Sequence, residues 1–358
     1  MVAPCRTPVR VFPVPLPGMG DSPLVIGGWL ADRDGVGYYR VRVPLDALER
    51  RGHSVEYDDF IPWRPGKRPA NHVLVGQRTS NAGPSQRWMA AAGDVRRVFE
   101  LDDLLLDVDP SSERPFEFYA DSGVRRRLLE NMRSADAVTV STQYLADAVR
   151  ADYGVTAPIY VLPNCLERSV FDLPPIDQSG PMTCGWSGSD THLADVSLLR
   201  RPLSRFLARR PEVGLTLAGV DYRGLLGVPQ ATVLGWHPIW ADPLGYYRRL
   251  TWQVTLAPLV SHHFNRAKSA LRALEAGARG SVVVASDVGP YADYIEHGVT
   301  GFLVSRDHEW SEYLNLLASD PELRASMAAA ARLQATAWCV DDHAHLWEQA
   351  YLGAQRGS

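Results

Sequence analysis

Lys268 stands in the stretch HHFNRAKSALRALE, residues 262–275, of a chain whose basic residues are otherwise almost all arginine. Asn265 is a favourable N-cap, so the pattern predicts a helix from residue 265 to about 278 with Lys268 as its third residue. A helix N-terminus carries partial positive charge and free N–H groups. A lysine at that position is therefore favourable when an anion binds beside it, and its compact charge suits phosphate.

Glu275 lies seven residues after Lys268, on the same face of the predicted helix and roughly 10 Å along its axis. A cation and a carboxylate so placed fit a nucleoside diphosphate, with Lys268 at the phosphates and Glu275 at the ribose hydroxyls. Without a ligand, both residues are solvated charges on a helix surface, and the helix pattern alone does not decide between these two interpretations.

A glycine-rich turn in CGWSGSDTHLAD follows a predicted strand and opens a helix. Ser187 and Gly188 lie in this turn, where glycine permits close approach of the backbone to a diphosphate. Asp190 or Thr191 is expected to cap the helix. His192 follows this turn. It either contacts a phosphate or an acceptor, or it only caps its own helix.

A second flexible turn, ADRDGVGYYR, begins the first half of the chain. Gly37 lies in this turn, and Arg40 lies in the first turn of the helix after it. Arg40 is placed to reach an anion, or it pairs with Asp46 or Glu49 on its own helix.

The acidic run VFELDDLLLDVDP ends another predicted strand. Asp102, with Glu100 and Asp103, is expected to line a cleft and contact sugar hydroxyls, or to serve only in capping. Asp107 and Asp109 form an Asp-x-Asp pair, which in a different fold with one nucleotide-binding domain holds a metal. Since no His/Cys cluster has metal-ligand spacing, no metal site is expected.

Apolar β-branched runs alternate with helix-period segments along the whole chain, which predicts an α/β fold with parallel sheets. The strand-like runs are PLVIGGWL, HSVEYDDF, NHVLVG, VRRVFELDD, DAVTVST, PIYVLPN, MTCGWSG, VGLTLAGV, ATVLGW, WQVTLAPL, SVVVASD and GFLV. The clearest helices are expected at residues 38–51, 124–134, 143–153, 192–209 and 265–278.

A proline-rich stretch at residues 171–181 divides the chain into two doubly wound, Rossmann-like halves that face a cleft. The expected domains are residues 1–172 and residues 173–338, followed by a helix in residues 339–358.

The composition excludes several classes of protein. The chain has 358 residues, a formal net charge of −4 and 46% hydrophobic residues, which suits two packed domains and argues against general nucleic-acid binding. Cys5, Cys165, Cys184 and Cys339 are widely spaced, so neither a disulfide framework nor a zinc site is expected, and a cytoplasmic location is predicted. No apolar run is long enough to span a membrane, and prolines interrupt the N-terminus where a signal peptide needs a helix.

The stretch from Ala257 to Val304 resembles the donor-binding core of retaining nucleotide-sugar glycosyltransferases with the GT-B fold, in the family 4-like group. The matching residues are Pro258-Leu259, Phe264-Asn265, Lys268-Ser269, Leu274-Glu275, Ala285-Ser286, Gly289-Pro290, His297-Gly298 and Gly301. The broad superfamily has a Glu-x7-Glu arrangement whose first glutamate would fall at Ala267. The chain therefore resembles the Lys-Ser variant, and no role of that first glutamate is carried over.

The resemblance implies transfer of a sugar from a UDP- or GDP-sugar to a hydroxyl acceptor, with retention of configuration, without metal and without a separate cofactor. It implies that Asn265, Ser269 and Gly289 join Lys268 and Glu275 at the donor. In that fold the first domain, residues 1–172, supplies most of the acceptor site, the second, residues 173–338, binds the donor, and the last helix, residues 339–358, returns to the first domain. A small molecule or glycan is the first acceptor class. Hydroxymethylated DNA or a protein is the second, resting on Arg125, Arg126 and Arg127, and a membrane lipid is the third.

The sequence leaves two other functions open. A phosphorylase of the same fold would need a pyridoxal cofactor on Lys67 or Lys268. A non-catalytic protein would bind a sugar nucleotide without turnover.

Overall fold

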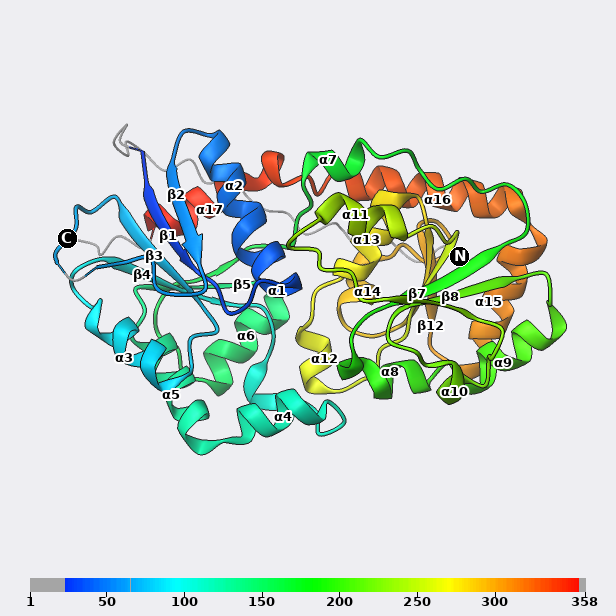
Figure 1. The fold of residues 1–358 in the computed structure, drawn as a ribbon, viewed down its shortest axis with the longest axis horizontal. Helices are drawn as coiled ribbons and strands as arrows, with labels where there is room; N and C mark the ends of the chain where they lie inside the picture. Colours follow the sequence, from blue (N-terminus) through cyan, green and yellow to red (C-terminus); the bar gives the residue numbers. More distant parts are fainter. Residues whose placement is uncertain (1–22, 65, 354–358) are drawn as a thin grey trace, which may run out of the picture.

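Two parallel six-stranded sheets organise the computed structural model, which describes residues 23–64 and 66–353 (Figure 1). Cys5, with the rest of the N-terminal stretch, and the last five residues of the predicted returning helix lie outside the described residues. All twelve predicted strand runs contain a strand, so the α/β prediction is confirmed. The chain passes between the sheets in residues 162–182, the stretch that contains the predicted boundary at 172/173.

The first sheet has the order β2-β1-β3-β4-β5-β6, with every pair parallel. Its strands are β1 (Val25–Trp29), β2 (Ser54–Asp58), β3 (His72–Gln77), β4 (Arg96–Leu101), β5 (Ala137–Val140) and β6 (Ile159–Val161). The strand order changes direction between β1 and β3. Ligands of doubly wound sheets bind beyond the carboxyl ends of the strands at such a switch point.

The second sheet has the order β12-β11-β10-β7-β8-β9, also parallel throughout. Its strands are β7 (Thr183–Ser187), β8 (Gly214–Gly219), β9 (Thr232–Gly235), β10 (Val254–Ala257), β11 (Val282–Ser286) and β12 (Gly301–Val304). This is the strand order of dinucleotide-binding folds, with the switch point between β7 and β10.

Helices connect the strands in both halves. In the first half they are α1 (Gly35–Gly37), η1 (Tyr38–Arg42), α2 (Val43–Arg50), α3 (Ala82–Ala90), η2 (Leu105–Asp107), α4 (Glu113–Ala120), α5 (Ser122–Arg133), α6 (Gln143–Asp152) and α7 (Arg168–Phe171). In the second half they are η3 (Asp190–His192), α8 (Leu193–Ser197), α9 (Arg200–Arg209), α10 (Arg223–Leu226), α11 (Pro243–Arg249), α12 (His263–Ala267), α13 (Leu271–Arg279), α14 (Pro290–Tyr294), α15 (Asp307–Ser319), α16 (Pro321–Thr336) and α17 (Val340–Gly353).

The long helix predicted at residues 265–278 is wrong, because it is two helices, α12 and α13. The N-cap of α12 is His262, whose ring accepts from the backbone N–H of Asn265. Lys268 is the C-cap of α12, with extended backbone at ψ 164°. The Thr142 hydroxyl of the first domain donates to the Ala267 carbonyl at 2.9 Å, so a tertiary bond occupies the end of α12.

The helix predicted at residues 192–209 is also divided, into η3, α8 and α9. Neither Asp190 nor Thr191 caps it, because η3 begins after Ser189 and neither η3 nor α8 has a side-chain cap bond. His192 instead lies at the junction of η3 and α8, where its backbone has left the helical region. The glycine turn and His192 therefore follow directly after the carboxyl end of β7.

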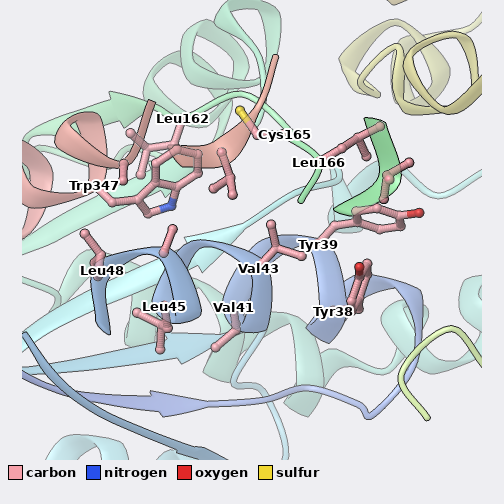
Figure 2. Packing of buried hydrophobic residues seen from close by; sticks show 14 of the residues in the cluster. Tyr38, Tyr39, Val41, Val43, Leu45, Leu48, Leu162, Cys165, Leu166 and Trp347 are labelled. Carbon is pink, nitrogen blue, oxygen red and sulfur yellow. The ribbon is translucent and has the colours of Figure 1, made fainter. Parts of the chain in front are cut away.

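The last described helix, α17, packs against α2 and β5 of the first domain, next to which Figure 1 shows it in red. Figure 2 shows its Trp347 lying close to Leu48 of α2 and Leu162 in one buried cluster. Arg51 of the α2 C-terminus pairs with Glu348 of α17 at 2.6 Å. Trp347 is 1% exposed, so its burial fixes the chain's return to the first sheet.

Candidate active site

The two switch points open onto one cavity between the domains, of about 270 Å³, which we call the Lys268 cavity. Its lining comes from the segments that follow β1, β3 and β4 on one side and β7 and β10 on the other. The lining residues are Val36, Arg78, Asp103, Leu105, Val108, Ser111, Ser112, Pro115, Tyr119, Ser189, Thr191, His192, Ala194, Asp195, His262, Phe264, Asn265 and Lys268. The cavity therefore lies where the topology predicts a ligand.

A larger cavity of about 480 Å³ lies in the first domain, lined by Val25, Gly27, Glu56 and Leu74 among others. Residues 60–64, which follow the edge strand β2, also line it, and none of its lining comes from the second domain. The Lys268 cavity is smaller, but it combines both switch points with the predicted donor residues. We therefore take it as the candidate active site.

Lys268 reaches across the domain boundary. Its Nζ lies 3.9 Å from Asp103 Oδ1 of the first domain and 4.6 Å from the centroid of the Phe264 ring. Its side chain is 23% exposed, and it faces the cavity with its charge only partly compensated. A cation that is held by a ring and one distant carboxylate is available to a bound phosphate.

Of the three carboxylates predicted to line the cleft, Asp103 lines the cavity, whereas Asp102 and Glu100 do not. Asp102 is tied to Arg78, whose Nε and Nη2 donate to its two oxygens at 2.5 and 2.6 Å. Arg78 also donates to Asp103 at 2.8 Å. Burial would raise the pKa of Asp103, but Lys268 and Arg78 hold it below its usual value, so Asp103 stays ionised.

Arg78 was not found by sequence analysis. It follows β3 at the switch point and has a φ of 49°, the left-handed region that side chains other than glycine seldom adopt. Its backbone N–H donates to the Glu100 carbonyl at 3.1 Å, which helps hold this conformation. Backbone strain of this kind is concentrated at functional sites, because surrounding contacts must maintain it.

His192 is held by Asp195 in a buried network. The His192 Nδ1 lies 2.9 Å from Asp195 Oδ2, and Asp195 Oδ1 accepts from Val260 N and Asn265 Nδ2 at 2.8 and 3.1 Å. Burial lowers the pKa of His192 to about 4, so its ring is neutral at pH 7. With Nδ1–H donating to Asp195, Nε2 is the acceptor nitrogen of the ring.

Asn265 therefore serves the site differently from the prediction. It lies inside α12, and its side chain donates to Asp195 and to the Val260 carbonyl. This bridge joins α12 to α8 and fixes the spacing between Lys268 and His192. Asn265 is 3% exposed, which makes it a positioning residue for the cavity.

Arg40 does not face the cavity. It is 2% exposed, and it pairs with Glu100 at 2.7 Å and not with Asp46 or Glu49. Its Nη1 donates to Asn164 Oδ1 at 2.9 Å, and Asn164 Nδ2 donates to Ser269 Oγ at 2.6 Å. Arg40 thus anchors Asn164, which in turn holds the segment after Lys268 against the first domain.

The predicted glycines are required by close packing. A Cβ at Gly37 would lie 2.1 Å from the Asp32 carbonyl oxygen, and one at Gly188 would lie 2.7 Å from the Trp186 ring. Gly289 has a φ of 46°, and its Cβ would lie 2.8 Å from Arg266 Cα. These positions keep the turns close to the cavity and to α12.

Glu275 lies outside the Lys268 cavity, in a cluster of Glu275 with buried Tyr39 and Tyr247 and half-buried Tyr246 that we call the Glu275 cluster. Glu275 is 6% exposed, and the Tyr39 hydroxyl donates to its Oε1. The Tyr246 hydroxyl acts on the pKa of Glu275 in the same direction as Tyr39. Burial raises the pKa of Glu275 to about 7, against the opposing effect of these hydroxyls.

Arg272 of α13 was missed by sequence analysis, and it lies between the two regions. Its Cζ is 5.5 Å from the centroid of the Trp186 ring, and its Nη2 would lie 3.1 Å from a Cβ at Gly188. Its charge adds to the lowering of the His192 pKa by burial, and it opposes the raising of the Glu275 pKa by burial. The turn after β7 thus has Arg272 beside it, a second cation at the predicted diphosphate position.

The predicted Asp-x-Asp pair approaches the two histidines before Lys268. Asp109 lies 3.9 Å from His262 Nε2, and Asp107 lies 3.8 Å from His263 Nδ1. Within residues 23–64 and 66–353, no group of three or more His, Cys, Asp or Glu side chains could hold a metal ion. In the same residues, no helix is long and apolar enough to span a membrane.

Sequence comparison identifies relatives of the second half of the chain. Residues 231–334 match the family model described as Glycosyl transferases group 1. A D-inositol 3-phosphate glycosyltransferase of Pseudarthrobacter chlorophenolicus is 38% identical over 105 residues, which cover 28% of this chain and 24% of that relative. The matched stretch is thus about a quarter of the relative's length.

Structural comparison extends the likeness to the whole fold. Sucrose-phosphate synthase from Thermosynechococcus elongatus has a TM-score of 0.67 at 15% identity, covering 92% of this chain and 98% of that one. Anabaena HepE in complex with UDP-glucose has a TM-score of 0.64 at 15% identity, covering 91% and 98%. A glycosyltransferase from Rickettsia africae has a TM-score of 0.64 at 13% identity, covering 95% and 100%. The GT-B architecture of two Rossmann-like domains is confirmed.

Proposed function

We propose that this chain, whose residues 231–334 form a glycosyltransferase group 1 domain within a GT-B fold, transfers a sugar from a nucleoside-diphosphate sugar to a hydroxyl acceptor. One observation carries the proposal: Lys268 and Arg272 both lie close enough to His192 to lower its pKa, and Arg272 lies over the ring of Trp186 in β7. A diphosphate that leaves the sugar gains negative charge, and two fixed cations stabilise that charge most in the transition state.

Backbone groups add to this stabilisation. The end of the turn, from Ser189 to His192, lines the cavity, and Gly188 before it packs closely against the Trp186 ring and Arg272. The first domain contributes Asp103 and the Val36 region from the opposite side. The sugar would lie between the two domains, with its diphosphate toward Lys268 and Arg272.

His192 is suited to a hydroxyl group. Its neutral ring offers Nε2 as an acceptor, and Asp195 fixes the orientation of that ring. We assign this nitrogen to a hydroxyl of the transferred sugar or of the acceptor. Asp195 lies behind His192 and acts on the reaction only through it.

The acceptor we favour is a small molecule or a glycan. The cavity of about 270 Å³ has space for a sugar-sized group, and the first domain lines it with Ser111, Ser112 and Tyr119. A DNA acceptor is less well supported, because Arg125 donates to the Leu106 carbonyl and Arg127 to the Ser80 carbonyl. Those guanidinium groups are already bound within the protein.

UDP-glucose is the first donor to test, since Anabaena HepE, a protein of the same fold, has been crystallised with UDP-glucose. We further propose that transfer proceeds with retention and without a metal. Retention rests on the resemblance of the Lys268–Glu275 stretch. Metal independence rests on the pair of side-chain cations, which can perform the charge stabilisation that a metal would otherwise supply.

The test is release of nucleoside diphosphate from a panel of UDP- and GDP-sugars, with simple glycosides as acceptors and in the presence of EDTA. The proposal expects acceptor-dependent release that falls sharply in Lys268→Ala. The matched control is Lys67→Ala, which removes the other lysine of the chain from an exposed loop. Tight donor binding with no release for any acceptor would favour a non-catalytic sugar-nucleotide-binding protein.

A further inference from the structure

The carboxylate predicted for the ribose is already bonded by a protein hydroxyl. The Tyr39 hydroxyl donates to Glu275, and the Tyr39 and Tyr247 hydroxyls lie 2.9 Å apart. Tyr39 and Glu275 are each 6% exposed, and Tyr247 is fully buried. A nucleotide cannot reach Glu275 in this arrangement unless a hydroxyl moves away.

The bond to Glu275 crosses the domain boundary. Tyr39 belongs to η1, a turn of π-helix in the first domain, whereas Tyr246 and Tyr247 belong to α11 of the second. Short π-helical segments occur often at functional sites, because the wider turn displaces side chains from the regular helix positions. Here η1 directs Tyr39 across the boundary to a residue of α13.

Displacing the Tyr39 hydroxyl from Glu275 has a clear chemical requirement. A carboxylate that loses a bonded hydroxyl in a buried place must gain another donor, since an unsatisfied buried acceptor is costly. A ribose offers two adjacent hydroxyls, one for each oxygen of the Glu275 carboxylate, of which Oε1 now accepts from Tyr39. A 2′-deoxyribose offers one.

We propose that the Tyr39 hydroxyl competes with the ribose of the donor for Glu275, so that nucleotide binding exchanges a bond between the domains for a bond to the ligand. This inference rests on the proposed function, because it takes Glu275 as the ribose ligand. Tyr39 thereby sets donor affinity and favours ligands that carry both ribose hydroxyls.

The other contacts between the domains do not depend on this exchange. Thr142 bonds the Ala267 carbonyl, Asn164 bonds Ser269, and Arg42 donates to the Trp240 carbonyl at 2.6 Å. They hold α12 and the loop before α11 on the first domain whether or not Tyr39 is bound. Loss of the Tyr39 hydroxyl should therefore leave the fold and the domain contact in place.

The test is calorimetric titration of UDP and GDP into the full chain and its Tyr39→Phe variant. The variant keeps the buried ring and removes the competing hydroxyl, so we expect the better of the two nucleotides to bind about five- to tenfold more tightly. The matched control is Tyr38→Phe, whose hydroxyl bonds Glu167 and not Glu275, and it should leave affinity unchanged. Equal or weaker binding by Tyr39→Phe would overturn the inference.

A second measurement needs no variant. The wild-type chain should bind the 2′-deoxy form of that nucleotide at least fivefold more weakly than the ribose form, and equal affinities would also overturn the inference. If the wild-type chain binds neither UDP nor GDP, the proposed function fails and the inference fails with it. If it binds them and Tyr39→Phe is no tighter, the inference alone fails.

Discussion

The Lys268 cavity and the Glu275 cluster both lie where the domains meet, but their charged side chains differ in exposure and in bonding. Lys268 is 23% exposed beside an open cavity, and its nearest carboxylate oxygen is 3.9 Å away. Glu275 is 6% exposed, and its carboxylate accepts from the Tyr39 hydroxyl of the other domain. The phosphate end of the proposed donor site is therefore preformed, whereas the ribose end must rearrange before it can bind.

This difference has an energetic cause. A lysine at a cavity edge keeps much of its hydration, and its aliphatic stem packs on the Phe264 ring. A buried carboxylate loses its hydration and needs bonded hydroxyls to stay ionised. We expect changes at Glu275 to appear first in stability and affinity, and changes at Lys268 to appear first in the rate of transfer.

Glu275→Gln should produce the largest change, in the pH dependence of stability. The pKa of Glu275 is raised from its ordinary 4.5 to about 7 in the folded chain, so the folded state favours the protonated form. Its contribution to stability is full below pH 4.5 and is lost as the pH rises through 7. The variant should gain about 3 kcal/mol relative to wild type over this range. Denaturant titrations at several pH values measure it, and parallel curves would show that Glu275 ionises normally.

Lys268→Ala should lower the rate of transfer by roughly 10- to 100-fold, as expected for loss of a charge-assisted contact of about 1.5–3 kcal/mol. The expected change in stability is small, because the lysine is partly exposed. Steady-state kinetics with the best donor give the effect, with Lys67→Ala as the control. Unchanged kinetics in Lys268→Ala would show that this lysine is a solvated side chain with no part in the transfer.

Asp195→Asn should lower kcat about tenfold and leave nucleotide affinity within about twofold. The amide cannot hold the His192 ring and accept from Val260 and Asn265 in the same way, so the ring loses its fixed orientation. Single-turnover kinetics and nucleotide titration separate the two quantities. An equal loss in affinity would show that Asp195 acts on the donor site as a whole.

Asp107→Asn should have the smallest effect, less than about twofold in kcat/KM. The carboxylate lies near His263 and outside the cavity lining. EDTA should likewise leave transfer unchanged. Loss of activity in EDTA, restored by manganese, would instead indicate that Asp107 and Asp109 bind a metal. It would contradict charge stabilisation by Lys268 and Arg272 alone.

The strands were predictable because each is a short apolar run between turn residues, and parallel strands buried on both faces need little else. The break after Lys268 was not, because it depends on a hydroxyl of Thr142 that is distant in sequence. A helix pattern carries no sign of such a partner. The true position of Lys268, at the end of α12, still leaves it beside the proposed diphosphate.

The same limit explains the side chains that were wrongly placed. Asp102 and Asp103 are adjacent and chemically alike, and the choice between them is made by Arg78 in a strained conformation. Arg40 was predicted to be free to bind an anion because its partner, Glu100 of β4, is distant in the sequence. Arg272 had the one usable signal, since it lies three residues before Glu275 in a helix of the predicted donor segment.

A crystal structure with bound UDP or GDP tests the central claim most directly. The account predicts the diphosphate within hydrogen-bond reach of Lys268 Nζ and the Arg272 guanidinium, with the main chain of the Gly188 turn alongside. It predicts the ribose at Glu275, with the Tyr39 hydroxyl moved away. A nucleotide bound elsewhere, for example in the cavity of about 480 Å³ lined by Phe60 and Trp63 in the first domain, would contradict it.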